Sequence, residues 1–323
     1  MKNIWIIGTG GVGGYFGGLL AFGNRENKLG LHVFFLARGE HLVHIRRDGL
    51  LLLAGNRKLR CFPDAASDNP VDFPDPDLIL LCVKAYDLTD VLRKIAPRVR
   101  EATTVLPLLN GIDISRRIRE YLPTGILLEA CVFVGTHILS PGVIEQKGGN
   151  GRIQAGASTG EPFDPEPLRN LFAQTEAAFD WFDDPRPAVW GKYLFIASYG
   201  LVTAESGKSL DAVYADPALR EEAAAVMREI SGIARRKGVV LPSNAVENAL
   251  EKAAEFPAGT RTSFQRDVET PGKRSEGDLF AGTILRFGRE LGLPTPETER
   301  LARILGQHAE IPARKPFDKE VYY

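Results

Sequence analysis

The sequence has few cysteines and no long hydrophobic run. Its 323 residues include only Cys61, Cys82 and Cys131, which are far apart and form no CxxC pair. We therefore expect no disulfide framework and no metal site. Cys82 lies in an apolar run and is expected to be a small buried side chain, and reduced thiols are typical of the cytoplasm. Glycines soon interrupt the apolar N-terminal segment, and no apolar stretch reaches about 18 residues, so we expect neither a secretion signal nor a membrane helix.

An excess of charge of either sign is also lacking. Lysine and arginine total 40 and aspartate and glutamate 41, which gives a net charge of −1. Nucleic-acid binding is therefore not indicated, and the partner is expected to be a small molecule held in a local site. With 44% hydrophobic and 25% charged residues, the composition is that of an ordinary globular protein. The length predicts two domains.

Apolar runs predict an α/β first half and a helical second half. Runs at 3–7, 32–36, 78–83, 104–109 and 125–131 alternate with helical patterns, which is typical of a parallel sheet covered on both faces. Glycine-rich residues 136–157 predict antiparallel strands, and a loop at 160–167 is expected to precede a helix over 168–179. Later helices are predicted at 192–204, 217–237, 244–254, 278–291 and from about 295, with a loosely ordered tail over 311–323. We predict a Rossmann-type doubly wound sheet in residues 1–186 and an all-α domain in residues 187–323.

The first predicted strand leads directly into a glycine motif. The segment GTGGVG matches GxGxxG, between a predicted strand and a predicted helix, which is the context that dinucleotide binding requires. Gly8 allows a tight turn, Gly10 lets a pyrophosphate approach the backbone, and Gly13 lets the helix pack closely on the strand. The alternative is a turn with a purely structural purpose. The predicted cofactor-binding residues are Gly8, Gly10, Gly11, Val12 and Gly13.

Three polar residues follow later strands of the predicted sheet. Arg38 ends the second strand, where an arginine suits the 2′-phosphate of NADP better than the acid typical of NAD sites. Lys84 follows the third strand and is a candidate for a cofactor phosphate. Asn110 follows the fourth strand and is a candidate for cofactor or substrate. Because ligands bind at the carboxyl ends of parallel strands, a functional role is favoured over a plain surface charge or turn.

The chain resembles the ketopantoate reductase (2-dehydropantoate 2-reductase) family along nearly its whole length. The glycine motif is common to many dehydrogenases, whereas the later segments are more specific in their order. The matching segments are GTGGVGG at 8–14, ARG at 37–39, VKA at 83–85, LNG at 109–111, WGK at 190–192, TS at 262–263, SEGD at 275–278 and LPTP at 293–296.

The resemblance implies NADPH-dependent reduction of 2-dehydropantoate to pantoate for coenzyme A synthesis. Lys192 matches the family's catalytic lysine and Glu276 its supporting glutamate. Asn110 and Ser263 match substrate-contacting positions, and Arg38 and Lys84 match contacts to the NADPH phosphate. An ammonium group at Lys192 can stabilise the negative charge that develops on the carbonyl oxygen and then supply a proton. A homodimer is possible.

The sequence departs from the family at two positions on the helix of the catalytic lysine. Family members commonly carry asparagines four and eight residues after that lysine, on the same helix face, and here these positions are Ile196 and Gly200. An extra Pro271 and a Glu276-Gly277-Asp278 sequence are further differences. Two alternatives stay open: reduction of a less polar 2-oxo acid or ketone, and a non-catalytic NADP-binding regulator.

Overall fold

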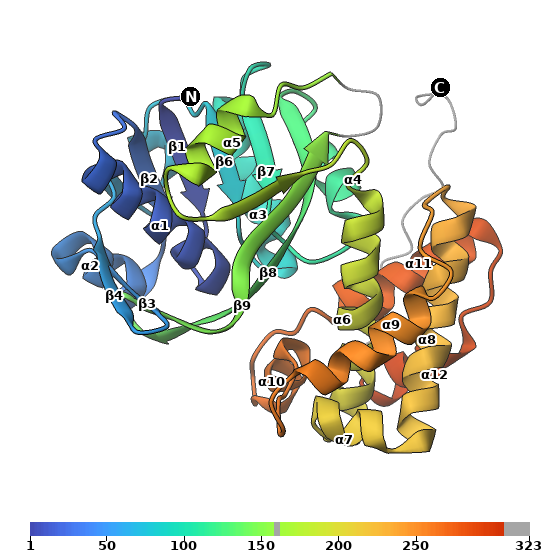
Figure 1. The fold of residues 1–323 in the computed structure, drawn as a ribbon. Helices are drawn as coiled ribbons and strands as arrows, with labels where there is room; N and C mark the ends of the chain where they lie inside the picture. The colour runs from blue at the N-terminus through green and yellow to red at the C-terminus, as the bar shows by residue number, and fades with distance from the viewer. Residues whose placement is uncertain (158–161, 307–323) are drawn as a thin grey trace. The chain divides into compact units, whose positions relative to one another are not determined.

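The computed structural model describes residues 1–157 and 162–306 and divides into two compact units, Met1–Tyr193 and Leu194–Tyr323. The first unit contains a large sheet with helices, and the second contains helices (Figure 1). The chain passes from one unit to the other within helix α6 (Arg186–Ser206). The predicted fold class, a Rossmann-type α/β part followed by an all-α part, is confirmed.

In the sheet of the first unit, the N-terminal strand β1 lies between β2 and β6. The strand order is β4-β3-β9-β8-β7-β6-β1-β2-β5, with β10 beside β9. Pairing from β5 to the start of β8 is parallel, while β8 and β9 are antiparallel. The order reverses at β1, so the carboxyl ends of β1 and β6 form the switch point where doubly wound sheets bind ligands. The strands are β1 (Asn3–Ile7), β2 (His32–Leu36), β3 (Leu50–Ala54), β4 (Arg57–Cys61), β5 (Ala65–Ser67), β6 (Leu78–Leu81), β7 (Thr104–Pro107), β8 (Ile126–Ser140), β9 (Val143–Ala157) and β10 (Ala178–Trp181).

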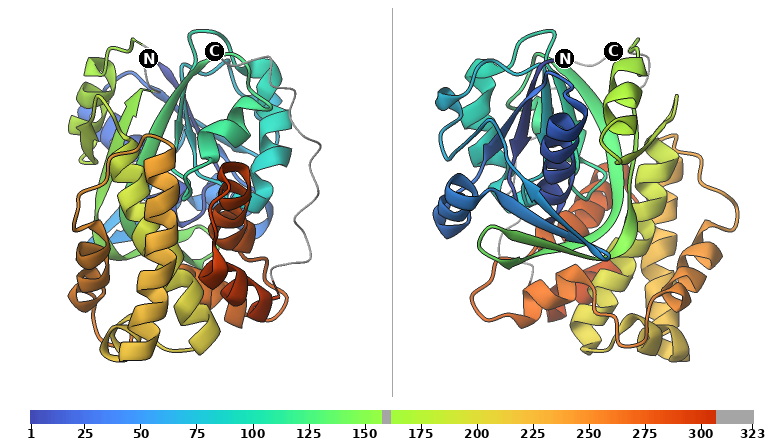
Figure 2. Two further views of the ribbon diagram at one scale, coloured as in Figure 1. Left: turned by 90° about the vertical axis from the view of Figure 1, so that its right-hand side faces the viewer. Right: turned by 60° about the vertical axis from the view of Figure 1, so that its left-hand side comes forward.

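Helix α1 (Gly11–Asn27) is buried on nearly every side of its first four turns. It contacts β1, β2 and β6 and also β3, β4, β8 and β9, so strands surround it (Figure 2). Glycines make this possible: a Cβ at Gly14 would lie 2.5 Å from Cγ1 of Ile144, and one at Gly17 would lie 2.9 Å from Cγ1 of Ile6. A helix packed on all sides shows no strong apolar stripe, which explains its uniformly apolar and glycine-rich sequence.

The other helices of the first unit are shorter. Parallel strands require long connections, and these helices supply them on the way from one strand to the next. They are α2 (Gly39–Asp48), α3 (Leu88–Ile95), α4 (Ile114–Arg119) and α5 (Glu166–Ala173), followed by the start of α6.

The second unit is organised around α8 (Pro217–Arg236). Asp216 caps this helix, since its carboxylate accepts hydrogen bonds from the amides of Ala218 and Leu219 at 3.0 and 3.3 Å, and Pro217 occupies the first turn. Helices α7, α9, α11 and α12 all contact α8. The remaining elements are α7 (Leu210–Ala215), α9 (Ala245–Glu251), α10 (Ser263–Glu269), a π-helical turn over Asp278–Gly282, α11 (Thr283–Leu291) and α12 (Pro296–Ile304).

The sequence-based prediction of a helix over 168–179 is wrong beyond its first half. Helix α5 ends at Ala173, and Glu176 adopts a left-handed conformation with φ of 61° that a helix cannot continue through. The chain then forms β10 beside β9, and Phe179 stacks on Phe172 with ring centroids 4.9 Å apart. Part of the predicted loop at 160–167 and the whole tail at 311–323 lie outside the described residues.

Candidate active site

The turn between β1 and α1 can be made only with glycines at two positions. Gly8 has a φ of +88°, and its amide donates to the carbonyl of Leu36 at 3.1 Å. A Cβ at Gly13 would lie 2.0 Å from the carbonyl oxygen of Gly8, far inside van der Waals contact. The two glycines therefore bring the first turn of α1 directly over the end of β1.

Gly10 is the one glycine of the motif that faces open space. It is the N-cap residue of α1, no atom lies within 4 Å of a Cβ built on it, and no acidic residue occupies the first turn. The first amides of a helix have no carbonyl partner within the helix, and the helix dipole adds partial positive charge there. This open, positively polarised cradle fits the pyrophosphate of a dinucleotide.

Gly11 and Val12 serve packing. A Cβ at Gly11 would lie 2.6 Å from the carbonyl oxygen of Thr136 in β8, and Val12 packs against the core of the first unit. Both were predicted to contact the cofactor. The structure gives Gly11 the task of letting a strand pass close to the helix start, and the two residues can offer the cofactor only their backbone.

His41 holds the glycine turn, and no motif in the sequence pointed to this histidine. Its Nε2 lies 2.8 Å from the carbonyl oxygen of Thr9, and the amide of Gly142 donates to its Nδ1 at 3.0 Å. Because a carbonyl can only accept and an amide can only donate, the ring must be neutral with its proton on Nε2. Burial lowers the pKa of His41, which agrees with this state.

Arg38 and the loop after β6 come together beside this turn. Register pairs Ile7 with both Leu36 and Leu81, so β1, β2 and β6 end at one edge of the sheet. Arg38 is 80% exposed, and its Nη2 lies 2.7 Å from Oδ2 of Asp87. Lys84, in the same loop as Asp87, is partly buried. The two predicted phosphate contacts therefore follow the strands on either side of β1.

Lys192 and Asn110 meet directly. Asn110 follows β7, and the next residue, Gly111, has a φ of +121° that turns the chain away from the sheet edge. Nζ of Lys192, from the first turns of α6, donates to Oδ1 of Asn110 at 2.7 Å and lies 5.9 Å from the centre of the Phe133 ring. All three residues belong to the first unit. An ammonium group is thus fixed at the carboxyl-end edge of the sheet.

Glu276 and Ser263, the other predicted site residues, belong to the second unit. Glu276 is 5% exposed, and its carbonyl accepts from the amide of Phe280 at the start of the π-helical turn, a rare form that often marks functional sites. Ser263 is exposed at the start of α10. The neighbouring Thr262 caps that helix through a 3.1 Å hydrogen bond from the amide of Gln265, so its hydroxyl already has a structural role.

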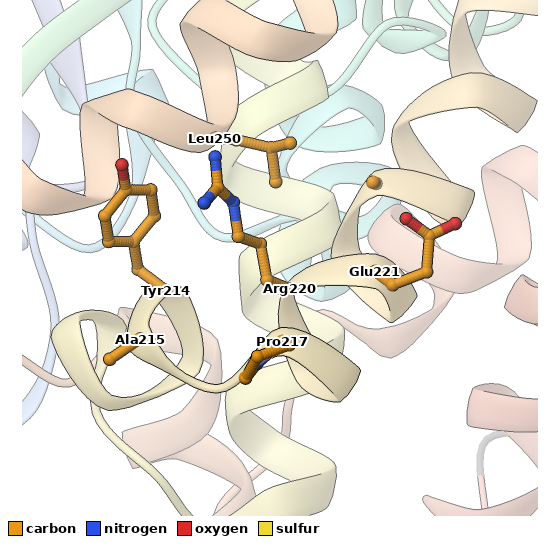
Figure 3. Close-up of a pocket in the computed structure, with 7 residues that line it drawn as sticks. Tyr214, Ala215, Pro217, Arg220, Glu221 and Leu250 are labelled. Atoms are coloured by element: carbon orange, nitrogen blue, oxygen red, sulfur yellow. The ribbon is translucent and has the colours of Figure 1, made fainter.

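A cavity of about 210 Å³ within the second unit contains none of the predicted site residues (Figure 3). The Arg220 guanidinium lies 4.6 Å from the centre of the Tyr214 ring on its wall. In residues 1–157 and 162–306, no cluster of three acidic, histidine or cysteine side chains is arranged to bind a metal ion. None of the helices in this part of the chain is both long and apolar enough to cross a membrane.

Comparison with known proteins gives two family matches. A model described as ketopantoate reductase PanE/ApbA matches residues 4–160, and a model of the C-terminal part of the same family matches residues 184–309. A 2-dehydropantoate 2-reductase of Mesorhizobium japonicum is 26% identical over 326 residues, covering 94% of this chain and 96% of the relative. An uncharacterized oxidoreductase of Bacillus subtilis, YkpB, is 25% identical over 295 residues, covering 91% and 94%.

Solved structures agree with this assignment of the fold. A PanE/ApbA family ketopantoate reductase from Ralstonia eutropha JMP134 has a TM-score of 0.84 and 28% identity, covering 95% of this chain and 98% of that one. A D-mandelate dehydrogenase in complex with NADH and anilino(oxo)acetate has a TM-score of 0.82 at 20% identity, covering 95% and 97%, and shares the fold.

The two kinds of glycine in the turn should respond differently to alanine. We expect Gly13→Ala to lower the free energy of unfolding by about 1–3 kcal/mol or more, because its methyl group has no space. Gly10→Ala should change that free energy by less than about 1 kcal/mol, yet weaken nicotinamide dinucleotide binding at least about tenfold by filling the cradle. Urea unfolding and cofactor fluorescence titration measure the two effects. Full binding by Gly10→Ala would contradict the assignment of the cradle.

His41 should make the protein less stable in acid. Its pKa in the folded chain lies below the ordinary value of 6.5 because burial disfavours the imidazolium. The unfolded chain therefore takes up a proton first, and the free energy of unfolding should fall as pH drops below about 6.5 and level off once the folded pKa is passed.

Urea midpoints at about pH 7.5 and pH 5.5 would measure this loss. We expect His41→Asn to reduce the difference between the two midpoints. His32→Asn is the comparison variant, because the ring of His32 is half-exposed and bonds to Asp64 and not to the glycine turn. A pH dependence that is the same in wild type and His41→Asn would show that His41 is not its source.

Proposed function

The chain belongs to the ketopantoate reductase family of nicotinamide-dependent oxidoreductases that act on CH–OH groups, and from this we propose that it reduces 2-dehydropantoate to pantoate with NADPH. Pantoate formed in this way would serve pantothenate and coenzyme A synthesis. The observation that carries the proposal is the hydrogen bond between Lys192 and Asn110 at the ligand-binding edge of the sheet.

Residues of this chain fit the two ends of a dinucleotide. The cradle at Gly10 suits the pyrophosphate, and Arg38 and Lys84, which follow the strands on either side of β1, suit the 2′-phosphate that distinguishes NADPH from NADH. When bound, the nicotinamide supplies a hydride to the keto carbon of the substrate. The protein's contribution is to position that carbon and to manage the charge and the proton on its oxygen.

Lys192 is the group that can do this. As hydride adds to the keto carbon, negative charge grows on the oxygen, and an ammonium held in place stabilises that charge without reorganising. Lys192 then transfers a proton to the alkoxide to complete the alcohol. Asn110 holds the ammonium through Oδ1, and the amide nitrogen of the same side chain carries donors of the kind that bind a carboxylate or hydroxyl oxygen.

Glu276 and Ser263, which belong to the second unit, are the other two residues for which we propose a role. The family resemblance assigns Glu276 to support of the lysine and Ser263 to substrate binding. The low exposure of Glu276 and the exposed position of Ser263 at the first turn of α10 are compatible with these tasks.

A second candidate substrate class is a 2-oxo acid without a hydroxyl group. Along α6, the positions four and eight residues after Lys192 are Ile196 and Gly200, which carry no polar side chain. A Cβ at Gly200 would lie 3.6 Å from the Phe264 side chain, so this stretch of the helix is lined by apolar atoms. Recognition of a hydroxyl depends on buried polar partners, and their loss reduces discrimination.

Replacing Lys192 should separate catalysis from cofactor binding. Lys192→Ala is expected to lower kcat/KM for ketopantoate at least about 100-fold, because the proton donor and the stabilising charge are both removed. NADPH binding, followed by fluorescence, should remain close to that of the wild type. Lys94→Ala, a change at an exposed lysine of α3, is the control and should keep full activity. Turnover retained by Lys192→Ala would rule out the proposed role.

A pair of substrates that differ in one hydroxyl should decide the substrate class. We expect kcat/KM to be higher for ketopantoate than for 3,3-dimethyl-2-oxobutanoate, which has the same carbon skeleton without the hydroxyl. Ile196→Asn should raise this ratio by about tenfold by supplying a polar partner. A wild-type ratio below one would instead favour the second candidate class.

A further inference from the structure

We propose that Asp87 sets the cofactor preference of this protein by competing with the 2′-phosphate of NADPH for Arg38. The inference rests on the proposed NADPH-dependent function and names a residue that the sequence comparison with the family did not single out. It makes Asp87 a specificity-determining residue, and it predicts that the protein discriminates less between NADPH and NADH than Arg38 alone would allow.

The carboxylate of Asp87 directly contacts the guanidinium of Arg38. Oδ2 of Asp87 lies 2.7 Å from Nη2 of Arg38, which is the distance of a charge-assisted hydrogen bond. Asp87 is anchored on the sheet side, since its side chain is 18% exposed and its amide donates to the carbonyl of Lys84 at 2.9 Å. Arg38 is the more exposed partner, with 80% of its side chain accessible to solvent. The carboxylate therefore determines where the guanidinium rests.

The two cofactors differ at the point that this ion pair occupies. The 2′-phosphate of NADPH carries about −1.5 to −2 charges near neutral pH and needs the guanidinium that Asp87 holds. Binding it requires either that Arg38 leaves Asp87 or that two anions share one arginine, and both options cost free energy. NADH presents hydroxyl groups instead, which can donate hydrogen bonds to a carboxylate. Asp87 thus opposes one cofactor and favours the other.

The size of the effect follows from exposure. Since Arg38 is 80% exposed, solvent screens its interactions, and an exposed pair of this kind is worth up to about fivefold in an equilibrium constant. The effect should shrink as salt is raised, because dissolved ions screen the interactions of exposed charges. A buried pair would show a larger effect with little salt dependence.

Removing the charge of Asp87 tests the competition. Dissociation constants of NADPH and NADH would be measured by fluorescence titration for wild type, Asp87→Asn and Asp90→Asn. Asp90 is an exposed carboxylate in the first turn of α3, so its substitution removes the same charge nearby without touching the ion pair. We expect Asp87→Asn to bind NADPH about fivefold more tightly at low salt, with no gain for NADH. Asp87→Ser keeps a residue type that is favoured at the N-cap of α3, and it should bind NADPH as tightly as Asp87→Asn does.

The double variant Arg38→Ala/Asp87→Asn separates competition from a general field effect. If Asp87 acts through Arg38, its substitution should leave NADPH affinity unchanged in the Arg38→Ala background. A gain that persists there, or an equal gain in Asp90→Asn, would overturn the inference while leaving NADPH-dependent reduction intact. Failure of the wild type to bind either dinucleotide would overturn the proposed function itself, and the inference with it.

Discussion

The close contact between the first strand and the first helix is the constraint on which the rest of the first unit depends. Gly13 lies so near the carbonyl of Gly8 that no side chain fits between them. This contact fixes the direction of α1, and the direction of α1 aims the amides of its first turn past Gly10. The same helix is the body around which β3, β4, β8 and β9 fold, so one turn determines both the cofactor cradle and the packing of the second half of the sheet.

The proposed proton donor is held by the same unit that carries the proposed cofactor cradle. Lys192 comes from α6, yet the atoms that fix its ammonium are Oδ1 of Asn110 and the Phe133 ring, both of which belong to the sheet of the first unit. A lysine side chain has four flexible bonds, and orienting it costs conformational entropy unless a partner is already in place. Asn110 is in place because Gly111 turns the chain directly after it. The catalytic geometry proposed here therefore follows from one hydrogen bond and one strand end.

Local sequence could predict the parts of the fold that depend on local pattern. The runs at 3–7 and 32–36 coincide with β1 and β2, since a strand buried on both faces needs only continuous apolar residues. It could not predict His41, whose partners Thr9 and Gly142 lie 32 and 101 residues away, because a single histidine on a short helix has no distinctive pattern. The β10 strand was missed for a related reason. Its apolar spacing suits a helix, and pairing with β9 decides the outcome.

Rigid and mobile elements divide the proposed recognition of the cofactor between them. The backbone of the glycine turn has almost no freedom, because strand, helix and His41 all hold it, and it meets the pyrophosphate that every nicotinamide dinucleotide has in common. The proposed partner of the 2′-phosphate is an exposed arginine that pairs with a single carboxylate, that of Asp87. A side chain at Gly8 or Gly13 would disrupt the fold itself, whereas a change at the ion pair shifts only an equilibrium between charges. Cofactor preference can therefore change in this fold by substitution of surface residues, while the mode of dinucleotide binding cannot.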